Sequence, residues 1–78
     1  MTEIRTIATQ LVALREALGM SQREVARRAG VSPDSLSKWE RGYYQPDDVN
    51  AAKWASALGM RLRVTRTLEP MEVTGSNK

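Results

Sequence analysis

The sequence predicts a small all-α domain of four helices followed by a C-terminal β-strand. Two observations lead to this class. Apolar residues recur at spacings of three and four over most of residues 1–60, and a glycine follows each of the four periodic segments. After Gly59 apolar and polar residues alternate, which is typical of a half-buried strand. We therefore divide the chain into a helical domain at 1–60, a strand at 61–68 and a flexible tail at 69–78.

Composition excludes several classes of protein. The chain has 78 residues, with no cysteine and no histidine. This removes thiolate chemistry, the commonest acid–base group and the commonest metal ligand. The other polar residues form no catalytic pattern, so we expect no enzyme, metal or cofactor. Lack of cysteine fits a reducing cytosol, and no apolar run is long enough to span a membrane. A net charge of +3 does not by itself call for nucleic acid.

Local signals mark the first two helices. Alternating spacings of three and four place the first helix at about residues 3–18. Its apolar stripe is Ile4, Ile7, Leu11, Leu14 and Leu18. The second helix spans 21–29, where Ser21 is the predicted N-cap and Glu24 completes a capping box.

The third and fourth helices also have clear ends. In SPDSLSKWERG (32–42), Ser32 is the predicted N-cap and Pro33 takes the first helical position. Gly42 ends this helix. Asp47 or Asp48 caps the fourth helix, DVNAAKWASAL. Its predicted apolar face is Val49, Ala52, Ala55 and Leu58. We expect Trp39 in the core and Trp54 to be partly buried.

The spacing across the second and third helices is that of a helix-turn-helix. Counting from Gln22, the fifth residue is the small Ala26, where two helices must cross closely. The ninth is Gly30, which adopts a left-handed turn without strain. The five apolar positions of the wedge are filled by Val25, Ala29, Val31, Leu36 and Trp39. The third helix is too short to be stable alone, so its neighbours must hold it, and its polar face can enter a DNA major groove.

The segment SQREVARRAGVSPDSLSKWERG resembles the Cro/repressor, or XRE-type, helix-turn-helix family. The matching residues are Ser21, Gln22, Glu24, Ala26, Gly30, Val31, Ser32, Ser37, Trp39, Glu40 and Gly42. The resemblance covers roughly residues 8–59 and implies a lambda-repressor-like fold with sequence-specific DNA binding. It also implies a buried ion pair between Arg15 and Glu40. Many relatives end in a fifth helix, whereas this chain is predicted to end in a strand.

The resemblance assigns the third helix to base contacts. The presented face consists of Ser32, Pro33, Asp34, Ser35, Ser37 and Lys38. Lys38 can donate to guanine O6 and N7 or bind a phosphate, and Asp34 can accept from cytosine N4. Alternatively, Asp34 is a helix-start charge that stays clear of DNA. Pro33 can offer only apolar contact.

Phosphate contacts are expected around this face. The resemblance implies that Gln22 bonds a phosphate and braces the third helix, and Arg23 lies beside it. Arg41, Tyr43 and Tyr44 follow the third helix, where relatives contact the DNA backbone. For the two tyrosines, packing against the fourth helix is the alternative. Arg27 and Arg28 are expected to be simply solvated.

The predicted strand needs a partner, because a lone strand is unstable and no second strand is visible in the sequence. We expect the same strand of a second copy, paired about a two-fold axis. Its apolar side is Leu62, Val64 and Leu68. Alternatively, the strand folds back on its own domain or stays loose. Some antitoxins of this type dimerise through such a strand.

Together these features predict a cytoplasmic homodimer that binds a palindromic DNA operator and represses transcription. The alternative is an antitoxin or adapter whose main ligand is a protein. An antitoxin usually binds DNA as well, so the two hypotheses overlap.

Overall fold

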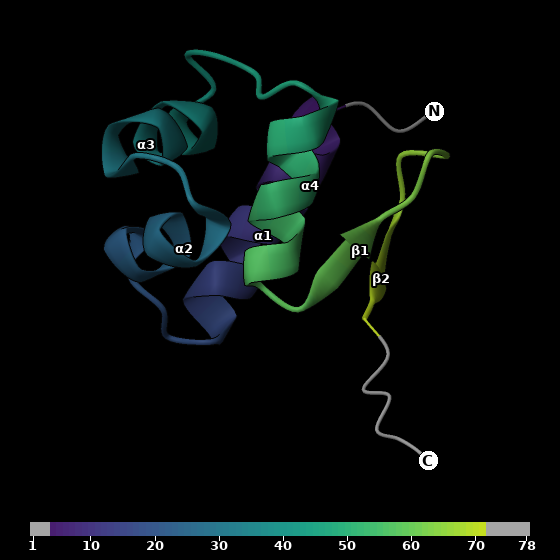
Figure 1. Ribbon diagram of the computed structural model, residues 1–78, viewed down its shortest axis with the longest axis horizontal. Coiled ribbons are helices and arrows are strands. Elements are labelled where there is room, and N and C mark those ends of the chain that lie inside the picture. The colour runs from purple at the N-terminus through teal and green to yellow at the C-terminus, as the bar shows by residue number, and fades with distance from the viewer. Residues whose placement is uncertain (1–3, 72–78) are drawn as a thin grey trace.

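The computed structural model describes residues 4–71, with side chains described from residue 7 onward. Four helices are followed by a two-stranded antiparallel sheet. The elements are α1 (Ile4–Ala17), α2 (Gln22–Ala29), α3 (Pro33–Arg41), α4 (Asp48–Ala57), β1 (Met60–Leu62) and β2 (Leu68–Pro70). In Figure 1, α2 and α3 lie on one side of α4 and the hairpin lies on the other, with α1 behind. The predicted four-helix class with a C-terminal β element is confirmed.

The apolar stripe of α1 supplies one wall of the core. Ile7 and Leu11 are buried, and Leu14 packs against the same cluster. Leu18 was predicted on this stripe but is half exposed. The helix ends at Ala17, and the chain turns at Leu18 and Gly19. The side chain of Ile4 lies outside the described part of the structure.

α4 buries a face that matches the predicted one only in part. The core residues here are Ala51, Trp54, Ala55 and Ala57 of the helix and Leu58 just after it, so the prediction is confirmed for Ala55 and Leu58. Val49 is 65% exposed, and Ala52 is exposed too, so the prediction was wrong for both. Val49 and Trp54 are five positions apart, about 140° around a helix, so they cannot both face the core. The larger indole buries more apolar surface, and Trp54 is 1% exposed with its ring 5.9 Å from that of Trp39.

The C-terminal segment is a hairpin rather than one strand. Leu62 pairs with Leu68, and Met60 pairs with Pro70. The predicted single strand at 61–68 is therefore wrong, because the chain reverses between β1 and β2. The reversal includes a bond from the Arg66 N–H to the Arg63 carbonyl (2.8 Å), and Arg66 has a φ of 65°.

The second strand that the sequence did not reveal thus lies in the same chain. Leu62 and Leu68 pack against the core of their own domain, whereas Val64 is 97% exposed in the loop. The structure shows the alternative in which the strand folds back. Residues 69 and 70 of the predicted tail belong to β2, and residues 72–78 lie outside the described part.

Candidate nucleic-acid interface

Side-chain caps fix where α2 and α3 begin. The Ser21 hydroxyl accepts from the Glu24 N–H at 3.0 Å, and the Ser32 hydroxyl accepts from the Ser35 N–H at 3.0 Å. Pro33 follows Ser32 in the first turn of α3, where its missing N–H costs no hydrogen bond. These caps set the point at which the chain enters each helix.

The turn between α2 and α3 has the geometry of a helix-turn-helix. Gly30 has a φ of 75°, in the left-handed region that favours glycine. The Val31 N–H donates to the Ala26 carbonyl at 3.0 Å, which closes the end of α2. The wedge residues Val25, Ala29, Leu36 and Trp39 are buried, and Val31 packs against them. The small Ala26 is fully buried at the crossing.

A half-buried polar network fixes α3 to α1 and α2. The Arg15 guanidinium makes two bonds to the Glu40 carboxylate, from Nε at 2.8 Å and from Nη2 at 3.1 Å. Its Nη1 also donates to the Met20 carbonyl at 2.8 Å. Gln22 Nε2 donates to Glu40 Oε1 at 2.9 Å. The side chains of Arg15 and Glu40 are only 15% and 6% exposed, so the pair is largely desolvated.

This network holds the C-terminal end of α3, and it leaves the N-terminal face free. Ser32, Pro33 and Asp34 are exposed on that face. Ser35, Ser37 and Lys38 are half-buried. The hydroxyls of Ser32 and Ser35 are hydrogen-bonded to each other at 2.9 Å.

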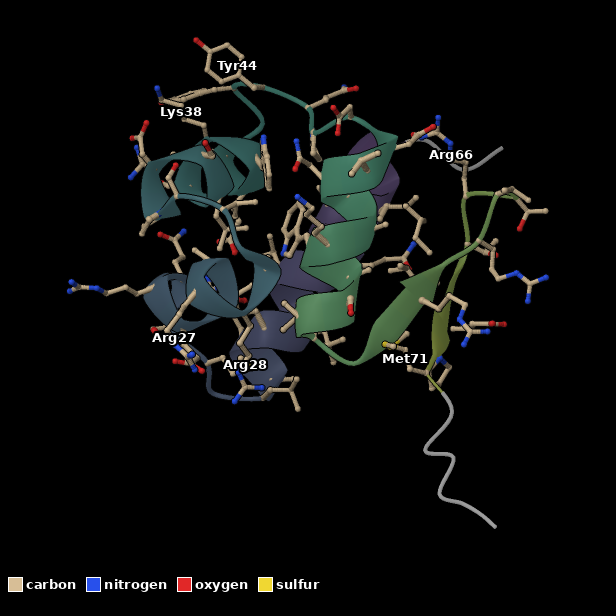
Figure 2. All side chains as sticks on the ribbon, in the orientation of Figure 1. Arg27, Arg28, Lys38, Tyr44, Arg66 and Met71 are labelled. Atoms are coloured by element: carbon tan, nitrogen blue, oxygen red, sulfur yellow. The ribbon has the colours of Figure 1, made fainter. Side chains whose placement is uncertain are left out.

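Two contacts define the position of Lys38. Its Nζ lies 3.1 Å from Asp34 Oδ2, one helical turn earlier, and 5.5 Å from the centre of the Tyr44 ring. Figure 2 shows Lys38 and Tyr44 together at one corner of the molecule, away from the hairpin that carries Arg66 and Met71. Sequence reasoning missed both contacts, although the spacing of Asp34 and Lys38 is the one that favours helical ion pairs.

The residues predicted to contact phosphates come from the start of α2 and from the C-terminal end of α3 with the loop after it. Arg23 is exposed near the start of α2, beside the half-buried Gln22. Arg41 is exposed at the last position of α3, and Tyr43 and Tyr44 are exposed in the loop that follows. Both tyrosines are more than half exposed, so neither is buried against α4, which was the alternative.

The other α2 arginines make a separate cluster. Arg27 and Arg28 both donate to the Glu24 carboxylate. These hydrogen bonds lower the pKa of the Glu24 carboxyl group from 4.5 to about 2, and the bond from Arg27 has the larger effect. The side chains of Arg27 and Arg28 are 70% and 54% exposed, as expected for solvated residues, but both are also paired with Glu24. In Figure 2 they lie away from Lys38 and Tyr44.

Comparison with known protein families shows to which family a chain with this arrangement of helices belongs. A family model described as helix-turn-helix matches residues 11–64. The chain belongs to the helix-turn-helix family. The match spans the whole helix-turn-helix unit, α4 and β1, so membership rests on most of the described fold. Within residues 4–71, none of the helices has the length and apolar character needed to cross a membrane.

The chain is similar to an antitoxin and to a transcriptional regulator. Antitoxin HigA1 of Mycobacterium tuberculosis is 37% identical over 62 residues, which is 80% of this chain and 42% of the antitoxin. An uncharacterized helix-turn-helix-type transcriptional regulator of Methanothermobacter thermautotrophicus is 40% identical over 45 residues, 58% of this chain and 65% of that protein. The chain thus spans less than two thirds of the length of either relative.

Proposed function

We propose that this domain binds double-stranded DNA sequence-specifically by placing the outer face of α3 in the major groove. One observation supports the proposal: the polar face of α3 is exposed, while the two ends of the helix are held in place. α3 is capped at Ser32 and fixed at Glu40. A helix held in this way loses little further freedom on binding, which lowers the cost of association.

The surrounding residues supply backbone contacts. Gln22 uses one amide N–H for Glu40, and its amide has a second N–H that can reach a phosphate. Arg23 is exposed near the start of α2, and Arg41, Tyr43 and Tyr44 are exposed at the end of α3 and in the loop after it. Contacts of this kind fix the register on DNA, and base contacts from α3 supply the sequence information.

We further propose that the protein acts as a homodimeric repressor of a palindromic operator, by occluding a promoter. The hairpin changes how the two copies meet. Since Leu62 and Leu68 pack on their own domain, the proposed interface is the outer edge of β2, with Val64 exposed nearby. Edge-to-edge pairing about a two-fold axis would join two hairpins into one sheet.

The proposed role is binding without catalysis and without a cofactor, in the cytoplasm. The support is the residue inventory, which contains neither histidine nor cysteine. A reducing compartment is compatible with a chain that has no disulfide.

A second candidate is an antitoxin whose principal ligand is a toxin protein. The similarity to Antitoxin HigA1 over 80% of this chain favours it. The two functions are compatible, because an antitoxin can regulate transcription through the same α3 face. A toxin gene adjacent to the gene for this chain would favour this candidate.

The test is a selection from random duplex DNA with the purified protein, followed by sequencing of the retained duplexes. We expect a palindromic motif whose half-sites are about one helical turn, roughly 34 Å, apart. A folded protein that enriches no motif would contradict the proposed function.

A further inference from the structure

We infer that Asp34 and Lys38 act as one unit that reads a single G·C base pair, with Lys38 on guanine and Asp34 on cytosine. This inference rests on the proposed function, because it requires α3 to lie in the major groove. It goes further by naming the base pair and its orientation.

The geometry of the ion pair matches the major-groove edge of G·C. Lys38 Nζ and Asp34 Oδ2 are 3.1 Å apart on an exposed helical face. In a G·C pair, guanine O6 accepts a hydrogen bond from cytosine N4, so these two atoms are about 2.9 Å apart. The ammonium can donate to O6 while the carboxylate accepts the second proton of N4. The four atoms then form a closed ring of alternating donors and acceptors.

The ring keeps the ion pair intact on binding. An ammonium has three N–H groups, enough for the Asp34 carboxylate, guanine O6 and guanine N7. Asp34 alone would be repelled by the DNA phosphates, but its charge is offset by Lys38. This explains how a carboxylate can lie on a DNA-reading face.

The other base pairs fit this unit less well. A T·A pair also presents an acceptor beside a donor, thymine O4 beside adenine N6. However, the thymine methyl group lies where the ammonium would meet guanine N7, and adenine N7 repels the carboxylate. In C·G and A·T the order of the base groups is reversed. The Lys38 ammonium would then face a base amino group, and the Asp34 carboxylate would face a base carbonyl oxygen. The expected order of affinity is therefore G·C, then T·A, then the two reversed pairs.

Tyr44 acts as a positioning residue for Lys38. Its ring lies 5.5 Å from Lys38 Nζ, on the loop that follows α3. The Lys38 ammonium is therefore contacted by Asp34 from the same helix and by the aromatic ring of Tyr44 from the loop beyond the helix end. These two contacts restrict a side chain that otherwise loses much rotamer freedom on binding.

The test repeats the random-duplex selection with the full chain and its variants, and then titrates the selected wild-type duplex with one base pair changed at a time. For the wild type we expect one oriented G·C position per half-site that loses about 5- to 150-fold in affinity when the pair is reversed. Asp34→Asn should shift that position toward T·A, because an amide can bond both N6 and N7 of adenine. Lys38→Met should abolish the preference there and leave the other positions unchanged.

The matched control is Asp48→Asn. Asp48 is also a carboxylate in the first turn of a helix, and it pairs with Arg66 at 3.1 Å, but it lies on α4. This variant should select the wild-type motif. Circular dichroism of each variant shows that it is folded.

The exchanged variant Asp34→Lys/Lys38→Asp gives an independent check. It should reverse the preferred pair to C·G at the same position. The inference is overturned if the wild type enriches a motif but Asp34→Asn and Lys38→Met leave every position of that motif unchanged. A wild type that enriches no motif contradicts the proposed function itself, so the two failures are distinguishable.

Discussion

Glu40 is the residue on which the placement of α3 most depends. Its carboxylate accepts from Arg15 twice and from Gln22 once, and its side chain is 6% exposed. A charge with so little water around it needs partners, because an unpaired buried charge is strongly unfavourable. The same carboxylate therefore fixes three helices relative to one another.

We predict that Arg15→Leu lowers the free energy of unfolding by about 3 kcal/mol, because it leaves the Glu40 carboxylate without its cation. Urea unfolding followed by tryptophan fluorescence measures this change. Arg28→Leu is the control, since its pair with Glu24 is exposed to solvent and its loss should change the free energy of unfolding far less. Equal midpoints for Arg15→Leu and the wild type would contradict the assigned role of the network.

Glu24 gives a prediction for acid stability. Bonds from Arg27 and then Arg28 lower its pKa to about 2 from 4.5. A lowered folded-state pKa means that the contribution to stability is present above about pH 4.5 and is lost as the pH falls toward 2. We expect wild-type protein to lose more thermal stability than Glu24→Gln between pH 5 and pH 2, as measured by melting temperature. Parallel pH profiles for the two proteins would contradict this.

For single residues, the helix caps could be predicted from the local sequence, whereas the extent to which a side chain is buried could not. Ser21 and Ser32 were identified as N-caps because capping depends on neighbouring residues only. The Arg15–Glu40 pair came from the family resemblance, since the two residues are 25 positions apart. How far Trp54 is buried depends on the rotation of α4 about its axis relative to the other helices. The sequence of α4 alone does not specify that rotation.

At the scale of elements, α4 and the hairpin show how tertiary packing decides between local patterns. α4 is apolar on more than one side, so its sequence is compatible with two faces. The packing of Trp54 beside Trp39 selects one of them. Each strand of the hairpin has only three residues. Alternation of apolar and polar residues over so short a segment does not distinguish two short strands from one longer strand. Residue 66, where the alternation of Leu62, Val64 and Leu68 calls for an apolar side chain, is an arginine, and it lies in the reversal.

The hairpin also stabilises the helical core. Leu68 is half-buried and packs against the core cluster, whereas Val64 lies in solvent. We predict that Leu68→Ala costs on the order of 1–2 kcal/mol, about half the loss typical of a fully buried leucine. Val49→Ser is the control, because Val49 is 65% exposed on α4 and lies outside the proposed interface, and it should change stability by less than about 0.5 kcal/mol. Chemical unfolding measures both variants, and equal losses for the two would contradict the packing role assigned to Leu68.

At the scale of the whole molecule, α4 separates two surfaces. The α3 face lies on one side of α4 and the hairpin lies on the other (Figure 1). This arrangement allows two copies to meet through their hairpins while both α3 faces remain available to DNA. We predict a sedimentation mass of twice the 8.7 kDa of the chain. A single species at the mass of one chain over the micromolar range would contradict the proposed homodimer.

Amide chemical shifts measured while a selected duplex is titrated into the protein would locate the DNA-binding surface residue by residue. If α3 contacts DNA, the largest shifts should fall at residues 21–23 and 32–38, with smaller shifts at 41–44. The amides of the hairpin report on the far side of α4. Shifts confined to the hairpin, with the amides of α3 unchanged, would show that DNA binds another surface.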